Sequence, residues 1–285
     1  MTAHVAEASE GSGRVLLWLD PNILASRQAV EAAVRLAAAY RSELETVDVE
    51  PPHVVFAEGV PIRRVDSSSS PAVSAGLDDD TARRSLGRRQ RRTIDDLTLE
   101  FEVPASHTRV SGDAIDQLAT MCVERGPWNV VAISRMPSAE IAPLIANIFA
   151  NVSGATGVLV GSRRTSPWRG RVAVVAEDGE RLPSMLRAAE RIAGKDGSTH
   201  LIVAAPAQAA FDELEAQARL LPEGSARLRF AASRPTYGVE GALDEPLINA
   251  APDLAIARFG GILLSDGAAL SRTLALTGAA FLLVR

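Results

Sequence analysis

Short apolar runs alternate with helix-forming patterns along this 285-residue chain, and the alternation restricts its fold more than any other feature. The clearest case lies between residues 112 and 163. A helical pattern ends at Gly126 and Pro127, a β-branched run covers 129–134, and a second helical pattern leads to an apolar run at 157–160. Apolar runs of this kind are typical of strands buried on both faces. The order therefore predicts a parallel sheet with crossover helices.

The same order of elements occurs twice. In the first half we expect strands at 14–19, 44–49, 106–110, 129–134 and 157–160. In the second half we expect strands at 171–176, 200–204, 226–231, 253–258 and 280–284. The repeat predicts a tail at 1–13, a first domain at 14–163 with a long loop at 50–80, a linker at 164–170 and a second domain at 171–285. The final strands of the two halves are apolar, and we expect exposed edges of that kind to be covered.

Composition limits the class of protein. A net charge of -5, with 47% hydrophobic and 23% charged residues, is ordinary for a soluble globular protein and gives no global reason to expect nucleic acid as a partner. The single cysteine, Cys122, excludes an intrachain disulfide and fits a small core residue. The first residues lack the pattern of a signal peptide, and no apolar run is long enough for a membrane helix. We expect a cytoplasmic protein without a membrane partner.

Several segments resemble a known family. They are VLLWLD at 15–20, the helix and strand at 26–49, the stretch 110–135, and, more weakly, RVAVVAED and PDLAIARFGG in the second half. Together they resemble the universal stress protein family in tandem form. The resemblance implies two flavodoxin-like, Rossmann-like α/β domains, each a five-stranded parallel sheet flanked by helices. It also implies that the domains pack as an intrachain pseudo-dimer, and that the protein has a role in stress response or regulation.

The glycine motif of that family is absent. The resemblance implies that nucleotide-binding members hold ATP through a segment after the fourth strand. This segment reads Gly-x-x-Gly, then nine residues, then Gly-Ser/Thr, and its backbone N–H groups approach the phosphates. In this chain no glycine follows Ser134 before Gly154, and Pro137 removes a donor. In the second half Gly260 and Gly261 form a pair that fits a tight turn, but the family's spacing does not continue. The expected nucleotide site is therefore degenerate.

Four residues are the candidates for what remains of a cofactor site: Asp20, Val49, Ser134 and Arg135. By the resemblance, Asp20 matches an acidic residue near the adenosine, and Val49 lies where a second-strand residue would pass the adenine. The alternative for Asp20 is a turn in Asp-Pro-Asn. Ser134 and Arg135 either bind an anion or lie at an exposed strand end. Asp178 matches Asp20 with a shift of one residue.

Other catalytic signatures are missing. The chain has no nucleophile elbow, no Walker loop and no dinucleotide fingerprint. Its histidines are scattered, and none has the spacing of a metal ligand; they are His4, His53, His107 and His200. We therefore expect no enzyme activity, no metal and no required cofactor, with ATP or another adenine nucleotide as the remaining option.

A basic run at 83–92 lies in a charged helix expected at 79–102. It is either a solvated helix face or a site for a polyanion or an acidic partner, and no aromatics lie between the arginines to stack on single-stranded nucleic acid. We expect a non-catalytic stress or regulatory protein that binds a protein partner through this helix and the loop at 50–80. The alternative is a sensor that binds an adenine nucleotide or other anion in one domain's cleft. A homodimer would use further surface.

Overall fold

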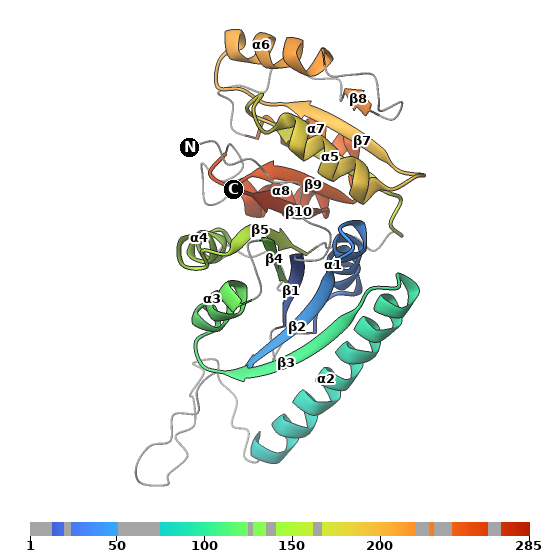
Figure 1. Cartoon of the computed structure of the whole chain (residues 1–285), viewed down its shortest axis with the longest axis vertical. Helices are drawn as coiled ribbons and strands as arrows, with labels where there is room; N and C mark the ends of the chain where they lie inside the picture. The colour runs from blue at the N-terminus through green and yellow to red at the C-terminus, as the bar shows by residue number, and fades with distance from the viewer. Residues whose placement is uncertain are drawn as a thin grey trace.

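The computed structural model describes residues 13–19, 24–50, 75–124, 128–134, 141–161, 167–220, 228–230, 241–261 and 269–285. Within these ranges ten strands form one sheet in the order β3-β2-β1-β4-β5-β10-β9-β6-β7-β8. The strands follow one another along the long axis of the molecule, from β3 at one end to β8 at the other (Figure 1). The predicted α/β class is confirmed.

The first half supplies one side of the sheet. Its strands are β1 (Gly13–Leu19), β2 (Glu43–Glu50), β3 (Ala105–Ser111), β4 (Trp128–Ile133) and β5 (Ala155–Val160), and they all pair in parallel. Its helices are α1 (Arg27–Ala39), α2 (Ala75–Glu100), α3 (Ala114–Glu124) and α4 (Ile141–Asn151).

The second half repeats this arrangement. Its strands are β6 (Arg171–Ala176), β7 (Ser198–Val203), β8 (Leu228–Phe230), β9 (Leu254–Arg258) and β10 (Ala280–Val284). Its helices are α5 (Leu182–Ala193), α6 (Gln208–Arg219), α7 (Asp244–Ala250) and α8 (Ala269–Thr277). In both halves the first strand lies between the second and the fourth, and the fifth lies at the centre of the whole sheet. The repeat predicted from the sequence is thus present in the structure.

The start of one helix differs from the predicted position. Helix α2 begins at Ala75, so the sequence pattern placed its start too late, at about residue 79. The acidic residues 78–80 therefore fall inside the helix and not before it. Most of the predicted loop, residues 51–74, and the predicted tail, apart from Gly13, lie outside the described residues. None of the described helices is long and apolar enough to cross a membrane.

The two halves join through their last strands. Strands β5 and β10 pair antiparallel, with Phe281 opposite Val160 and Val284 opposite Gly157. A side chain on Gly157 would lie 3.2 Å from the carbonyl oxygen of Leu283, so the glycine permits the close approach. Each strand therefore covers the apolar edge of the other within one chain.

Each face of the sheet carries a core that crosses this junction. One core lies under α1, α2, α5 and α6 and includes Leu36, Leu97, Leu186 and Phe211. The other lies under α3, α4, α7 and α8 and includes Leu118, Ile145, Leu247 and Leu270. Because each core contains side chains from both halves, the halves are packed together on both sides of the sheet.

Cationic and aromatic side chains add contacts near the junction. The Arg35 guanidinium on α1 lies 4.4 Å from the ring centre of Phe101 and 5.1 Å from that of Trp168, which belongs to the predicted linker. Arg191 on α5 lies over Tyr40, at the end of α1, at 5.3 Å. The first helix of one half is thus held against the first helix of the other, in addition to the pairing of strands.

A buried polar network ties the first half together at the amino ends of its strands. Arg14 forms an ion pair with Glu45 and donates to the carbonyl oxygen of Met121 near the end of α3. Its Nε lies 3.2 Å from Oδ1 of Asn129, and Thr108 donates to the second Glu45 oxygen at 2.8 Å. Since the side chains of Arg14 and Glu45 are almost fully buried, each charge requires the other to compensate for the loss of water.

We expect the Phe281→Ala substitution to lower the free energy of unfolding by about 3–5 kcal/mol, because it opens a cavity at the strand junction. Phe281 is 0% exposed. Urea denaturation gives the value. Leu276→Ala is the control, since Leu276 is 52% exposed and the change should stay within about 0.5 kcal/mol. Equal effects of the two substitutions would contradict a packed junction.

A second prediction concerns the buried ion pair. Arg14→Met should lower the free energy of unfolding by about 3–5 kcal/mol, because it leaves the Glu45 carboxylate buried without its counter-charge. The double variant Arg14→Met with Glu45→Leu should regain most of this loss in the same denaturation measurement. If the double variant were as unstable as the single one, the uncompensated charge would not be the cause.

Candidate functional site

The strand order predicts a crevice in each half. In open α/β sheets ligands bind beyond the carboxyl ends of the strands, where the strand order reverses. In this sheet the reversal lies between β1 and β4 in the first half and between β6 and β9 in the second. The residues that follow these four strands are therefore the ones to consider.

In the first half the structure places two of the four predicted residues. Ser134 follows β4 and is 5% exposed, and its hydroxyl donates to the carbonyl oxygen of Trp18 at 2.8 Å. Val49 lies near the end of β2, on the other side of β1, and is also 5% exposed. Asp20 and Arg135 lie outside the described residues. The Ser134 hydroxyl thus continues the contact between β4 and β1, and its proton is already donated.

In the second half the corresponding turn contains Gly260 and Gly261. Gly260 has a φ of +75°, a left-handed conformation that glycine adopts without strain, and this agrees with the tight turn expected from the sequence. The carboxylate of Glu177, which follows β6, lies directly against Gly261, so a side chain at that position would require the carboxylate to move. The chain therefore places one of its own anions at the strand-end turn.

Charges of the second crevice also pair with each other. Asp178 accepts a hydrogen bond from the backbone N–H of Arg181 at 2.9 Å, in the turn that leads into α5. Its other oxygen lies 3.4 Å from the guanidinium groups of both Arg181 and Arg258. Arg258 ends β9, so this contact spans the point where the strand order reverses.

Sequence reasoning identified Asp178 but missed the roles of Glu177 and Arg258. The available signal was their position, since one directly follows β6 and the other ends β9. Which of two adjacent acids turns toward the glycine pair depends on packing around the turn and has no sequence pattern.

Cys122 lies in the core beneath α3 and is 0% exposed. Burial raises the pKa of its thiol to about 11, and the nearby Arg14 only partly opposes this. The thiol is therefore protonated at neutral pH and is a poor nucleophile. The structure confirms it as a small core residue.

Two histidines are described, one in each half. His107 Nδ1 lies 2.7 Å from the Thr46 hydroxyl, and His200 Nε2 lies 3.1 Å from the Ser198 hydroxyl. Burial, followed by nearby arginines, lowers the pKa of both imidazoles. Among the described residues no three His, Cys, Asp or Glu side chains come together as metal ligands.

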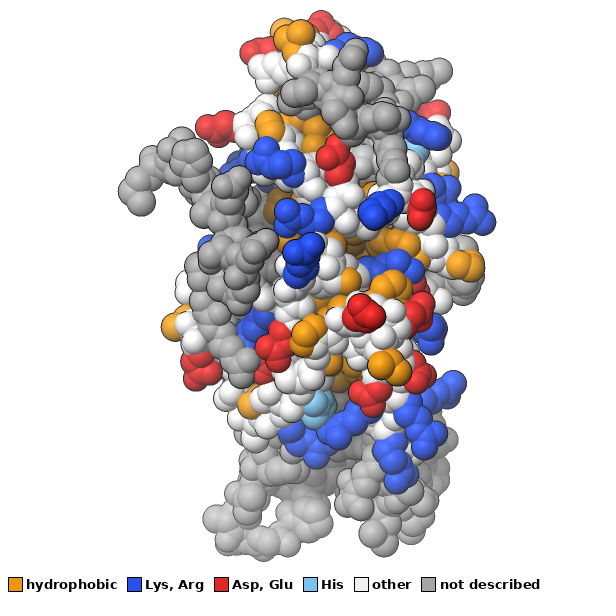
Figure 2. Space-filling view, turned by 45° about the vertical axis from the view of Figure 1, so that its right-hand side comes forward, with side chains coloured by type: hydrophobic (Ala, Val, Ile, Leu, Met, Phe, Trp, Pro, Cys, Tyr) orange, Lys and Arg blue, Asp and Glu red, His pale blue; other side chains and the backbone are white. Residues whose placement is uncertain are grey.

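A third candidate is the outer side of α2. Arg88, Arg89, Arg91 and Arg92, which we call the arginine face, are all exposed. None of them forms an ion pair with any residue in the described part of the chain. Figure 2 shows Lys and Arg side chains gathered toward the lower end of the molecule, where Figure 1 draws α2 and β3.

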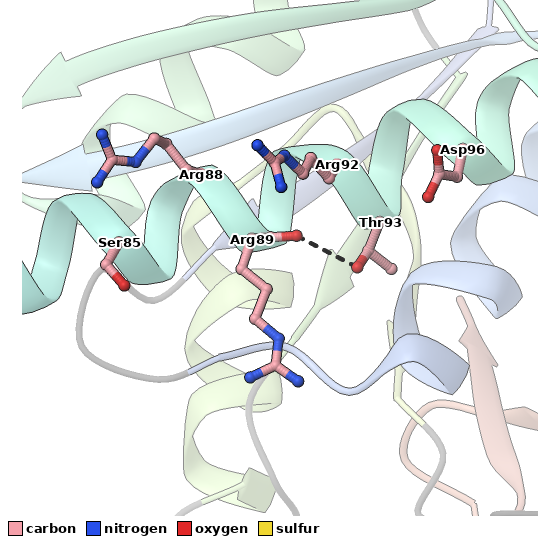
Figure 3. A pocket seen from close by; sticks show the side chains of 6 residues that line it. All are labelled: Ser85, Arg88, Arg89, Arg92, Thr93 and Asp96. Atoms are coloured by element: carbon pink, nitrogen blue, oxygen red, sulfur yellow. Dashed lines mark hydrogen bonds between the residues drawn. The ribbon is translucent and has the colours of Figure 1, made fainter.

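A shallow hollow lies along this helix. Its lining comprises Ser85, Arg88, Arg89, Arg92, Thr93 and Asp96 (Figure 3). Arg88 and Arg92 extend to the same side of the helix one turn apart, whereas Arg89 extends to another side. The hollow is therefore open, cationic along most of its length, and negative at Asp96.

The state of Cys122 gives a third prediction. In the folded protein at pH 7.5 a thiol reagent such as 5,5′-dithiobis(2-nitrobenzoate) should react with Cys122 at least about a hundredfold more slowly than with the unfolded chain, because the thiol is buried and protonated. Absorbance of the released thiolate measures the rate with and without guanidinium. Rapid reaction of the native protein would show that the core beneath α3 opens readily.

Comparison with known proteins establishes the fold. No protein-family model matches the chain, and neither does any curated protein sequence. Two solved structures are similar over nearly the whole length. A universal stress protein from Archaeoglobus fulgidus DSM 4304 has 9% identity and a TM-score of 0.60, covering 95% of this chain and 96% of its own. The cytoplasmic domain of a prokaryotic cation chloride cotransporter has 12% identity and a TM-score of 0.52, covering 95% of both chains.

The resemblance to universal stress proteins is thus confirmed for the fold. The similarity extends over both halves, as the tandem interpretation requires. At these identities it concerns the backbone arrangement and not the residues of a site. The chain has the fold of a tandem universal stress protein.

Proposed function

We propose that this protein is a non-catalytic regulatory protein of the universal stress protein type, with a degenerate nucleotide site, that acts by binding another protein. The observation that carries the proposal is the Glu177 carboxylate against Gly261. An anionic ligand approaching this turn would meet a negative charge at short range. Asp178 adds a second carboxylate at the same strand ends.

The first-half crevice supports the same proposal. The Ser134 hydroxyl donates to Trp18, and the sequence after it contains Pro137 but no glycine before Gly154. A cradle of backbone N–H groups requires close approach of the phosphates, which glycine permits and proline does not assist. The sequence after β4 therefore favours a first half without the cradle of donors that a triphosphate requires.

The surface available for a partner is on α2 and not on β5 or β10, which pair with each other at the centre of the sheet. The strands β5 and β10 are covered by each other, while the arginine face is exposed and forms no ion pair among the described residues. An exposed group of like charges favours association with a partner of opposite charge.

A nucleotide or anion sensor is the second candidate. Ser134 and Val49 flank the end of β1 in the first half, where a ligand of this fold class would bind. In this candidate Asp20 and Arg135 would complete the site from the segments that follow β1 and β4.

The fourth prediction separates the two candidates. Isothermal titration of the purified protein with ATP should show no saturable heat, and the thermal unfolding temperature should not rise. A bound nucleotide would stabilise the fold by about 2.7 kcal/mol at a hundredfold excess over Kd. Micromolar binding that disappears in Asp20→Ala but persists in Glu177→Ala would reject the proposal and assign a ligand site to the first half. Binding lost in Glu177→Ala alone would place the ligand in the second half and would reject it equally.

A further inference from the structure

The outer stripe of α2 carries two arginines and an exposed leucine in line, and its chemistry specifies the kind of segment that fits it. We propose that Arg88, Arg92 and Leu99, the docking stripe, bind an acidic amphipathic helix of a partner protein. The inference rests on the proposed function, since it specifies the partner of that surface. It concerns a site separate from both strand-end crevices.

The three side chains share one side of the helix. At about 3.6 residues per turn, the spacings of four and seven residues place them within about 40° of one another around the axis. The rise of about 1.5 Å per residue puts Arg92 about 6 Å and Leu99 about 17 Å beyond Arg88. Figure 3 shows the two guanidinium groups extending to the same side.

The stripe is accessible along its length. Leu99 is 81% exposed, although the buried residues of the same helix include Ile94 and Leu97. Arg88 and Arg92 are exposed and form no ion pair in the part of the chain that is described. The helix thus packs against the protein through one side and presents cations, the carboxylates of Asp95 and Asp96 and an apolar group on the other.

Asp96 favours a protein segment over a nucleic acid. It lines the hollow beside Arg92 and falls between the arginines and Leu99 along the helix. A continuous phosphate backbone following the stripe would place negative charge against Asp96 and would leave Leu99 without an apolar partner. A protein helix avoids both costs, because its carboxylates need lie only opposite the arginines.

The complementary segment has a defined spacing. Two carboxylates one helical turn apart would pair with Arg88 and Arg92, and charge-assisted hydrogen bonds to guanidinium are the stronger kind. An apolar side chain seven positions beyond the second carboxylate would cover Leu99. This combination of carboxylates and an apolar anchor is typical of a helix that docks on another helix.

The fifth prediction uses a synthetic probe with that spacing. An alanine-based, fluorescein-labelled peptide carries two glutamates four positions apart and a leucine seven positions after the second. Fluorescence anisotropy with the full chain should show saturable binding. The double variant Arg88→Glu with Arg92→Glu should raise the Kd at least about tenfold, and Leu99→Ala should raise it about three- to tenfold.

Matched controls isolate the stripe. Arg187 is exposed on α5, so Arg187→Glu makes the same charge change elsewhere and should alter the Kd by less than about twofold. A scrambled peptide of identical composition should bind at least about tenfold more weakly, since only the ordered spacing meets the stripe. Circular dichroism of each variant checks that the fold is unchanged.

Three results would overturn the inference: equal binding of the scrambled peptide, a Kd unaffected by the arginine reversals, or no binding at all. Tighter binding of a duplex DNA oligonucleotide that is lost on arginine reversal but insensitive to Leu99→Ala would replace it with a polyanion site. The ATP titration is independent of all three. If neither the peptide nor ATP binds, the docking stripe is rejected and the degenerate nucleotide site is not. If both bind, the degenerate nucleotide site is rejected and the docking stripe is not.

Discussion

The antiparallel pairing of β5 with β10 is the contact on which the rest of the architecture depends. It turns two five-stranded parallel sheets into one sheet and aligns a core on each of its faces. Parallel sheets require helices on both faces, and here those helices meet across the junction as well, as Arg191 over Tyr40 shows. Because the joined strands are apolar and central, the edges that remain are the polar outer strand β3 and the short β8.

The halves share a backbone plan but differ in the chemistry of matching positions. In the first half a buried Arg14 is balanced by Glu45 on the neighbouring strand. In the second half Arg171 opens β6 as Arg14 lies near the start of β1, yet β7 carries His200 in place of a carboxylate. There Asp253 instead accepts the backbone N–H groups of Arg169 and Arg171, both at 2.9 Å. One half is held by a side-chain ion pair, the other by a carboxylate bound to backbone.

Most of the fold could be predicted because buried parallel strands have a strong sequence signal. The runs at 171–176 and 280–284 were predicted with the bounds that the structure shows. Predicted helix boundaries were less accurate where charged residues replace the hydrophobic periodicity, as at the start of α2. The candidate site was harder to predict from the sequence, because contacts such as Glu177 against Gly261 join residues that only the folded sheet brings together. Asp20 and Arg135 remain predictions.

The internal strand junction has a consequence for valency. In a symmetric dimer of identical chains every surface occurs twice, and any change in sequence alters both copies. When both partners of the junction belong to one chain, a feature can arise in one half alone. The helix α2 between β2 and β3, which contains the basic run at 83–92, has as its counterpart α6, whose sequence QAAFDELEAQAR contains three acids and a single arginine. Each chain therefore presents this basic run once, in a molecule whose backbone is otherwise two-fold repeated.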